Sequence, residues 1–330
     1  MTAPVLAVQT TRLTKYFGPH VAVSDIDLEV PQGALFGLIG PNGAGKTTTL
    51  RMLAGLTRPT SGTVRLGGVS VDAGDRATLT RKVGWVPDGF GVYEDMRAWE
   101  YLDFFARCYA VPAADRARLV DELLDLVDLT EKRDADVNTL SRGMKQRLCL
   151  AHALVHAPDV LLLDEPAAGL DPRARIELRA LLTELTALGT TIIVSSHILS
   201  ELAEMCDGVA IMERGRLLAQ GDVGDLVRQG HSQAVQVVRV ELARSHPALR
   251  DTIDGWEDHR VVLMDDAVDA DGDGAERDAR WLTIELPAGD EARAALLARL
   301  VGQGAAVTAF VPVTRGLEDV FMAITRGEVN

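Results

Sequence analysis

The chain has 330 residues, of which 47% are hydrophobic and 25% are charged, a composition typical of a globular protein with room for one large domain and one small one. The formal net charge of −14 argues against a general nucleic-acid-binding protein, because such proteins need cationic surface to displace counterions from phosphates. The three cysteines are isolated, which suits a reducing compartment and argues against a disulfide framework or a zinc site.

The sequence gives no sign of insertion into a membrane. No apolar run approaches the roughly 18 residues that would cross a bilayer. The first residues lack the basic segment and the long apolar segment of a secretory signal. We therefore expect a cytosolic protein.

Residues 1–230 read as alternating strands and helices, the pattern of an α/β domain. Apolar and β-branched runs predict strands at 35–40, 63–68, 83–87, 160–166 and 190–197. The last two are apolar throughout, as expected of strands buried on both faces. Between 92 and 130 leucines recur at three- and four-residue spacing and predict one helix stripe, made of Leu119, Leu123, Leu126 and Leu129. We expect a helical subdomain at about 90–157, inserted into the α/β core.

The pattern changes near 228–233, which predicts a boundary between a domain of residues 1–230 and a second domain of residues 231–330. The second part contains predicted strands at 234–242, 260–266, 280–287 and 306–313 and predicted helices at about 290–302 and 317–325. We interpret it as a small α+β accessory domain without site chemistry of its own.

An acidic stretch at 269–280 resembles half of a calcium-binding loop. Asp269, Asp271, Asp273 and Gly274 match the first positions, but the twelfth position holds Arg280 in place of the bidentate glutamate. No second helix pattern follows it. We therefore interpret the stretch as a solvated acidic loop.

A glycine-rich segment after the strand at 35–40 fits the phosphate-loop pattern G-x-x-x-x-G-K-S/T and opens a predicted helix. Glycines allow successive backbone N–H groups to turn toward an anion, and the helix N-terminus adds positive potential. Lys46 is predicted to reach the β- and γ-phosphates, Thr47 to present its hydroxyl to Mg²⁺, and Thr48 to reach a second phosphate oxygen. The segment consists of Gly40, Pro41, Asn42, Gly43, Ala44, Gly45, Lys46 and Thr47.

An acidic pair follows the apolar strand at 160–166. Asp164 at the end of a buried strand can hold Mg²⁺ directly or through a water, and Glu165 can orient and polarise an attacking water. Such a pair is weak evidence alone, but it becomes strong beside a phosphate loop. Together the two motifs indicate a P-loop NTPase without narrowing the class.

Other motifs narrow the class of P-loop NTPase. The segment LSRGMKQRL (140–148) resembles the signature sequence of ABC ATPases, AGLD (168–171) resembles their D-loop, and SSH ending at His197 resembles their switch histidine. Phe17 matches the aromatic position that stacks on adenine in that family. The resemblance covers residues 5–230 in the expected order. It implies a P-loop NTPase core of ABC type with an inserted helical subdomain, followed by the small C-terminal α+β domain.

The resemblance also implies an arrangement of two subunits. Two ATP molecules would be held head-to-tail, each between the phosphate loop of one subunit and the signature of the other. The helix beginning near Gly143 would aim its positive end at a γ-phosphate, contacted by Ser141 and by the Gly143 N–H. The expected site then comprises Glu165, His197 and Lys46 as catalytic residues, Phe17, the phosphate loop, Ser141, Gly143, Met144 and Asp171 around ATP, and Thr47, Asp164 and Asp88 around Mg²⁺.

The sequence departs from the family pattern at two places. Asp88 stands where the family usually has a glutamine that contacts the metal and the transmembrane partner, so its charge adds to those of Asp164 and Glu165. Arg142 and Met144 replace a glycine and a glutamine of the usual signature. Both departures, and the ending RGLEDVFMAIT (315–325), resemble a drug-export and ABC-2 branch of the family. That branch implies export through a separate membrane permease and attachment to the inner face of the cell membrane.

Aromatic residues are concentrated after Asp88 in a chain that has only 5% of them: Phe90, Tyr93, Trp99, Tyr101, Phe104 and Phe105. Each could simply pack the helical subdomain. The functional hypothesis is a groove that receives a short helix from the membrane subunit. It predicts that some of Phe90, Tyr93 and Trp99 are exposed around a cleft next to Asp88.

Two other functions compete with a transporter subunit that dimerises with itself or with a paralogue. A soluble ABC ATPase of translation or DNA repair usually carries two cassettes or a long coiled coil, whereas this chain has one cassette and no heptads. A small-molecule P-loop kinase would leave residues 140–148 and the D-loop without a purpose. Nothing in the sequence identifies a cargo.

Overall fold

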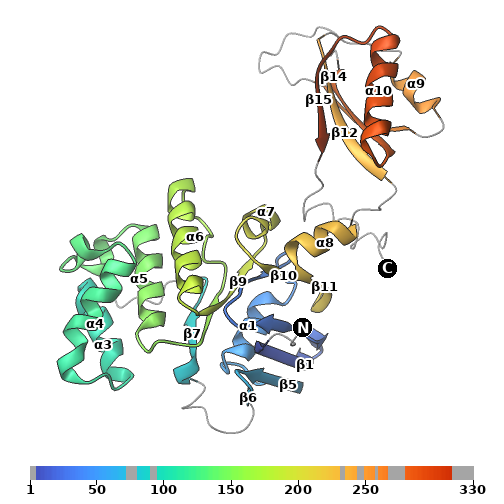
Figure 1. Ribbon diagram of the computed structural model, residues 1–330. Helices are drawn as coiled ribbons and strands as arrows, with labels where there is room; N and C mark the ends of the chain where they lie inside the picture. The colour runs from blue at the N-terminus through green and yellow to red at the C-terminus, as the bar shows by residue number, and fades with distance from the viewer. Residues whose placement is uncertain are drawn as a thin grey trace. The chain divides into compact units, whose positions relative to one another are not determined.

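The computed structural model describes residues 5–71, 80–89, 95–230, 235–243, 249–256, 259–266 and 279–313. The chain divides into two compact units, Met1–Val223 and Gly224–Asn330 (Figure 1). The predicted helix at 317–325 and most of the acidic loop at 269–280 lie outside the described residues, so their predictions stay predictions.

A six-stranded sheet forms the centre of the first unit, in the order β11-β10-β4-β9-β8-β7. The neighbours in this order run parallel except for the antiparallel pair β10 and β11. Every residue of β4, β8 and β9 is buried, which confirms strands covered on both faces. The bounds are β4 Leu35–Ile39, β7 Val83–Val86, β8 Val160–Leu163, β9 Thr191–Ser196, β10 Gly208–Glu213 and β11 Arg216–Asp222.

The first unit also contains a second, antiparallel sheet. Of its strands, only the one near 63–68 was predicted from the sequence. The sheet contains β1 (Leu6–Phe17), β2 (His20–Ile26), β3 (Glu29–Pro31), β5 (Ser61–Leu66) and β6 (Val69–Ser70). The long strand β1 pairs with three others, and its ladders shift register at several points. These shifts interrupt the two-residue alternation from which a strand is recognised in sequence.

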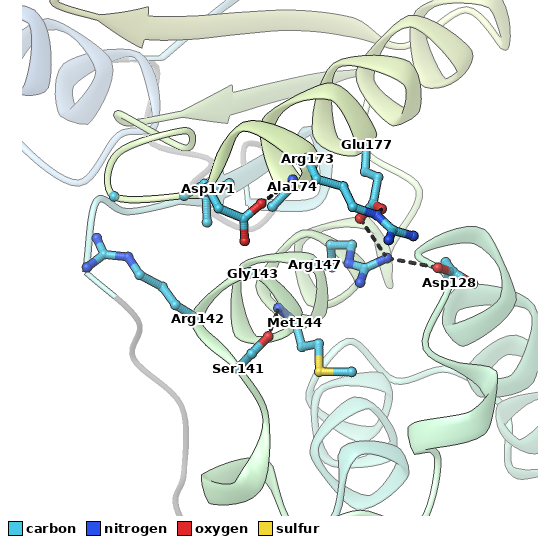
Figure 2. A pocket seen from close by; sticks show the side chains of 12 residues that line it. Asp128, Ser141, Arg142, Gly143, Met144, Arg147, Asp171, Arg173, Ala174 and Glu177 are labelled. Carbon is cyan, nitrogen blue, oxygen red and sulfur yellow. Dashed lines mark hydrogen bonds and ion pairs between the residues drawn. The ribbon is translucent and has the colours of Figure 1, made fainter.

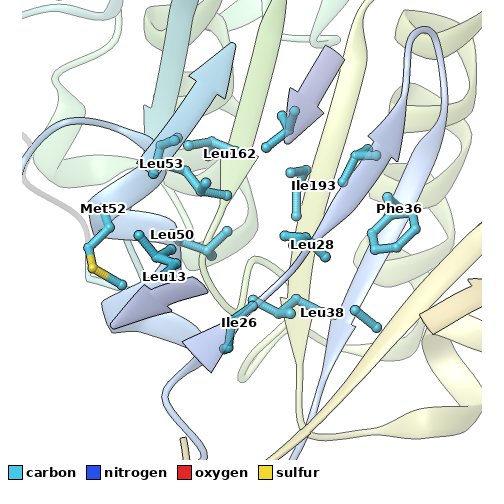
Figure 3. Close-up of a cluster of buried hydrophobic side chains, with 14 of the residues drawn as sticks. Leu13, Ile26, Leu28, Phe36, Leu38, Leu50, Met52, Leu53, Leu162 and Ile193 are labelled. Atoms are coloured by element: carbon cyan, nitrogen blue, oxygen red, sulfur yellow. The ribbon is translucent and has the colours of Figure 1, made fainter. Parts of the chain in front are cut away.

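One hydrophobic core joins the two sheets through α1 (Lys46–Leu53), the helix that the phosphate loop opens. Figure 3 shows Leu50, Met52 and Leu53 of this helix among side chains of both sheets. Leu13, Ile26 and Leu28 come from the antiparallel sheet side, and Phe36, Leu38, Leu162 and Ile193 from the central sheet. Packing against side chains of both sheets thereby fixes α1 in place.

Helices α3 (Ala98–Cys108), α4 (Ala113–Leu126) and α5 (Arg142–Leu154) fall within the predicted helical range and pack on one another (Figure 1). Short turns η1 (Thr130–Lys132) and η2 (Val137–Thr139) connect α4 to α5. The predicted stripe was wrong in detail. The buried face of α4 is Val120, Leu123 and Leu124, and Leu129 is buried outside the helix, which ends before the left-handed residue Asp128 (φ 53°).

Two further helices flank the central sheet, α6 (Pro172–Ala187) and α7 (Leu199–Ala203), and α8 (Val223–Gly230) begins at the division between the units. The second unit has the order β12 (Val235–Leu242), α9 (Leu249–Asp254), β13 (Arg260–Asp266), β14 (Ala279–Pro287), α10 (Asp290–Gly302) and β15 (Val307–Val313). Its antiparallel sheet is ordered β13-β14-β12-β15, which with two helices is the ferredoxin-like βαββαβ arrangement. Helix α9 was not predicted.

Candidate functional site

The phosphate loop connects β4 to α1 and depends on glycine at two tight points. A Cβ at Gly40 would lie 2.3 Å from the Met212 carbonyl oxygen. Gly45 caps α1 with φ 102°, and a Cβ there would lie 2.6 Å from the Ala22 carbonyl oxygen. A side chain at either position would therefore displace backbone. The glycines let the loop turn against β10 and leave the N-terminus of α1 directed at the loop.

Lys46 lies inside this loop with only 5% of its surface exposed. Its ammonium donates a hydrogen bond to the Gly40 carbonyl oxygen at 2.6 Å. The same nitrogen lies 3.1 Å from Oε1 of Glu165. The lysine charge is thus held beside the loop amides by one carbonyl and one carboxylate, where an anion on the loop would meet it.

Asp164, at the end of β8, connects the loop to the central sheet. One of its carboxylate oxygens, Oδ1, accepts hydrogen bonds from Thr47 Oγ1 at 3.1 Å and from Ser195 Oγ at 2.8 Å. Ser195 in turn accepts a hydrogen bond from the backbone N–H of Glu165 at 2.9 Å. A fully buried hydroxyl on β9 therefore fixes both acidic residues at once.

Glu165 stands between two basic side chains. Oε1 faces Lys46, and Oε2 lies 2.8 Å from Nδ1 of His197. The residue has a left-handed backbone with φ 48°, an unfavourable conformation for a residue with a side chain. The side chains of Lys46, Glu165 and His197 therefore meet at this carboxylate.

Burial raises the pKa of the Asp164 carboxyl, against the hydrogen bonds from Ser195 and Thr47, which lower it. The negative charges of Asp88 and Glu165 raise this pKa further. Asp88 is exposed and follows β7, which is the neighbour of β8. The predicted metal ligands Thr47, Asp164 and Asp88 therefore belong to one electrostatic group.

The signature residues and the D-loop line a separate pocket of about 320 Å³ (Figure 2). Ser141 caps α5, and its Oγ accepts a hydrogen bond from the Met144 N–H at 3.3 Å. Asp171 caps α6 by accepting a hydrogen bond from the Ala174 N–H at 2.9 Å. Gly143 lies between these caps, because a Cβ there would meet the Ala174 methyl at 3.4 Å. Among the described residues, none of those that line this pocket comes from 40–48.

Phe17 ends β1 with 52% of its surface exposed, and Lys15 Nζ lies 5.0 Å from the centre of its ring. An exposed ring at the end of a strand is available for stacking. The prediction that Phe17 contacts adenine stays a prediction.

The aromatic residues after Asp88 divide into several environments. Phe90 and Tyr93 lie outside the described residues. Trp99 is half-buried with the Arg133 guanidinium 5.4 Å from its ring centre, and Tyr101 is buried at 1% exposure. Phe104 is exposed, whereas Phe105 packs on His152 with ring centres 3.6 Å apart. Packing of the helical subdomain thus accounts for Tyr101 and Phe105, and the docking cleft stays a prediction.

Two residues of this region were not assigned from sequence. Ser195 bonds to both acidic residues, although the sequence shows it only as part of SSH. Arg142 was recognised as a departure from the signature, but its contact is with the D-loop, where Nη2 donates to the Ala168 carbonyl oxygen at 2.9 Å. Neither partner is visible in the sequence, because both contacts join segments more than 25 residues apart.

The described residues add two facts about metals and membranes. No group of three or more His, Cys, Asp or Glu side chains among them is arranged to hold a metal ion. In the same parts of the chain, no helix has both the length and the apolar character that crossing a membrane requires.

Comparison with known proteins gives the family. Residues 23–168 match the profile of the ABC transporter family. Over 324 residues the chain is 36% identical to Nod factor export ATP-binding protein I of Cupriavidus metallidurans. The alignment covers 98% of each of the two chains. A solved ATP binding subunit of an ABC transporter superposes with a TM-score of 0.61 at 30% identity and covers 68% of this chain and 92% of that one.

A second solved structure is also similar to this chain. It is cbiO1 from Clostridium perfringens, described as part of the ABC transporter complex cbiONQ, with a TM-score of 0.62 at 27% identity over 68% of this chain and 94% of that one. The phosphate loop, the signature helix and the acidic pair all lie in the first unit. The chain belongs to the ATP-binding proteins of the ABC transporter family and is an ATPase.

Proposed function

We propose that the chain binds ATP through the backbone amides of residues 40–47 and through Lys46. The ammonium of Lys46 lies where it can leave the Gly40 carbonyl oxygen for a phosphate oxygen without crossing solvent. The helix dipole of α1 adds to the potential at the same place. Phe17, exposed at the end of β1, would stack on the adenine.

Magnesium fits the donors at this site. Thr47, Asp164 and Asp88 offer only oxygen atoms, the donors that Mg²⁺ prefers, and a set this small suits an ion that takes its other ligands from phosphates and water. The ion would neutralise negative charge on the phosphates as the terminal bond breaks. On the protein side, the hydrogen bonds from Ser195 and Thr47 hold the Asp164 carboxylate in a fixed orientation for it.

Glu165 is the group that we assign to the attacking water. Its carboxylate is anchored by Lys46 on one oxygen and by His197 on the other, which leaves little freedom to rotate. A carboxylate fixed in this way can accept a hydrogen bond from water and direct its oxygen in line with the terminal phosphate. His197, nearly half exposed, would turn one ring nitrogen to the γ-phosphate.

The signature pocket calls for a second subunit. Ser141, Gly143 and Met144 line a pocket that, among the described residues, is separate from the phosphate loop of the same chain. The cap of α5 offers N–H groups and a hydroxyl, which suit the γ-phosphate of a nucleotide held by a second copy or a paralogue. Two such contacts related by a twofold axis would close two ATP molecules between two chains.

We further propose that this dimer drives export through a separate integral membrane subunit and is located at the inner face of the cell membrane. The support is the name of the relative in Cupriavidus metallidurans, which is a Nod factor export ATP-binding protein, and the solved relative that is part of a transporter complex. The Asp88 region is the proposed contact with that subunit. The phosphate chemistry is independent of the cargo.

The observation that carries the proposal is the position of Glu165 between Lys46 and His197, beside Asp164 and Thr47. The test is steady-state hydrolysis of ATP by the purified chain with and without magnesium. Glu165→Gln keeps the shape of the side chain and should lower turnover by about a hundredfold or more. The control is Glu184→Gln on the exposed face of α6, which should match the parent. Equal turnover in the parent and Glu165→Gln would remove Glu165 from this role.

A further inference from the structure

The signature helix and the segment that follows Glu165 are joined within the same chain by Arg142. This residue begins α5, directly between Ser141 and Gly143. Its Nη2 donates a hydrogen bond to the Ala168 carbonyl oxygen at 2.9 Å. In Figure 2 its side chain, which is among those that line the pocket, extends toward the loop that leads to Asp171.

Gly169 makes this contact possible. Its backbone is left-handed with φ 69°, and a Cβ at this position would lie 2.8 Å from the Cζ atom of Arg142. The planar guanidinium therefore lies directly against the Gly169 backbone while it donates to the preceding carbonyl. Hydrogen bond and close packing together fix the loop to the first turn of α5.

Ala168, whose carbonyl oxygen accepts from Arg142, is also bonded to Glu165 through its own N–H. The Ala168 N–H donates to the Glu165 carbonyl oxygen at 3.0 Å, and the Leu170 N–H donates to the Ala167 carbonyl oxygen at 3.2 Å. Asp171 then caps α6. The segment 165–171 is thus a continuous run of turns between the left-handed Glu165 and a helix, with Arg142 bonded at its middle.

We propose that Arg142 is a positioning residue that links the signature corner of a chain to the catalytic Glu165 of that same chain. The inference rests on the proposed dimer and deepens it. When Ser141 and Gly143 close on the nucleotide of the partner, Arg142 moves with the first turn of α5. Its bond to Ala168 then carries that movement to Glu165, which serves the other nucleotide. Each ATP site thereby reports its closure to the other.

The test uses mixed dimers of the full-length chain, in which one copy carries Glu165→Gln so that only one Glu165 is active. The two copies carry different affinity tags, and the mixed dimers are isolated by selecting for one tag and then for the other. Arg142→Ala is placed either on the copy with the active Glu165 or on the copy with Glu165→Gln. The readout is ATP turnover per dimer, the KM for ATP, and dimer formation with magnesium and ATP.

We expect turnover about tenfold lower when Arg142→Ala shares the chain with the active Glu165, with the KM and dimer formation retained. On the other chain, Arg142→Ala should leave turnover unchanged. Arg142→Lys keeps the positive charge and can still donate but lacks the planar guanidinium, so it should give an intermediate loss in the first arrangement only. Arg118→Ala, which removes an exposed arginine from α4, is the control and should have no effect in either arrangement.

Equal losses in the two arrangements, or a loss only when Arg142→Ala lies opposite the active Glu165, would overturn the inference, because they would show that Arg142 acts on the nucleotide of the partner. No loss in either arrangement would overturn it as well. Failure of the Glu165→Gln copies to form any ATP-dependent dimer would instead contradict the proposed function on which the inference rests.

Discussion

Lys46 and Glu165 form an ion pair of 3.1 Å between Nζ and Oε1, although they are 119 positions apart and both are largely buried. The lysine comes from the first turn of α1 and the glutamate from the end of β8, two strands away in the sheet from β4. Their approach places the proposed phosphate contact and the proposed water contact within one ion pair.

Lys46→Ala should bind ATP more weakly than the parent chain. Loss of the ammonium removes a charged donor from the phosphate loop, and such a hydrogen bond contributes about 1.5–3 kcal/mol, which corresponds to a loss of about 10- to 150-fold in ATP affinity. Equilibrium binding of a fluorescent ATP analogue measures it. Lys132→Ala, in the exposed turn η1, should bind like the parent. Unchanged affinity in Lys46→Ala would place the phosphates elsewhere.

Ser195→Ala tests the link between the acidic residues. The substitution removes the donor to Asp164 and the acceptor of the Glu165 N–H, both in a buried place. An unsatisfied buried polar group costs about 1–3 kcal/mol, so urea unfolding should show a loss of about 2 kcal/mol and turnover should fall by about tenfold.

The neighbouring Ser196→Ala is the matched control. Ser196 is also buried on β9, but its hydroxyl accepts from the Ile198 N–H rather than bonding to an acidic residue. It should lose stability without the fall in turnover. Equal turnover in both variants would show that Ser195 does not position the acidic pair.

Much of this site is readable in the sequence, because residues of one motif adopt a known local geometry. The phosphate loop, Asp164 and Glu165 were placed from strand ends and spacing, and His197 from the resemblance of SSH to the switch histidine of ABC ATPases. Ser195 could not be placed, because its partner depends on the register in which β8 and β9 pair, with Leu163 opposite Val194. The neighbourhood of Asp88 and Asp164 likewise depends on β7 lying beside β8.

In the fold, too, local sequence patterns predicted some strands, whereas strands that depend on long-range pairing were missed. The apolar strands β8 and β9 were predicted because burial on both faces leaves an uninterrupted apolar run. The antiparallel sheet was largely missed, since β1 contains the left-handed Arg12 and changes partner along its length. Long-range pairing decides such strands, and a local pattern does not contain it.

Asp88→Asn gives a prediction on pH. Burial is the main cause of the raised pKa of Asp164, and the negative charge of Asp88 adds to it. The titration of the Asp164 carboxyl is followed by NMR in the chain without magnesium. Removing the charge of Asp88 lowers the pKa of Asp164, so the midpoint of this titration should move to lower pH. Asp115→Asn on α4 should leave the midpoint unchanged. A midpoint that stays in place or moves to higher pH in Asp88→Asn would contradict this electrostatic coupling.

His152→Phe tests the helical subdomain. Burial lowers the pKa of His152 to about 4, whereas an unfolded histidine titrates near 6.5. The unfolded chain binds the proton first, so stability is fully present above about pH 6.5 and is lost toward pH 4, by at most about 3 kcal/mol. Urea unfolding at pH about 7 and about 4.5 should show a smaller pH dependence in His152→Phe.

The control for this experiment is His20→Gln, which changes an exposed histidine at the start of β2. It should retain the pH dependence of the parent. A parent-like dependence in His152→Phe would show that the neutral ring of His152 is not what acid destabilises.

We propose that two chains close on ATP through the phosphate loop of one and the Ser141–Gly143 corner of the other, and light scattering of Glu165→Gln with magnesium and ATP tests this closure. We expect a dimer that retains nucleotide. Adding Gly143→Asp should give a monomer that still binds ATP, because a carboxylate there repels the phosphate. A Glu165→Gln chain that stays monomeric with ATP bound, or a dimer indifferent to Gly143→Asp, would show that the chains do not close on ATP in this way.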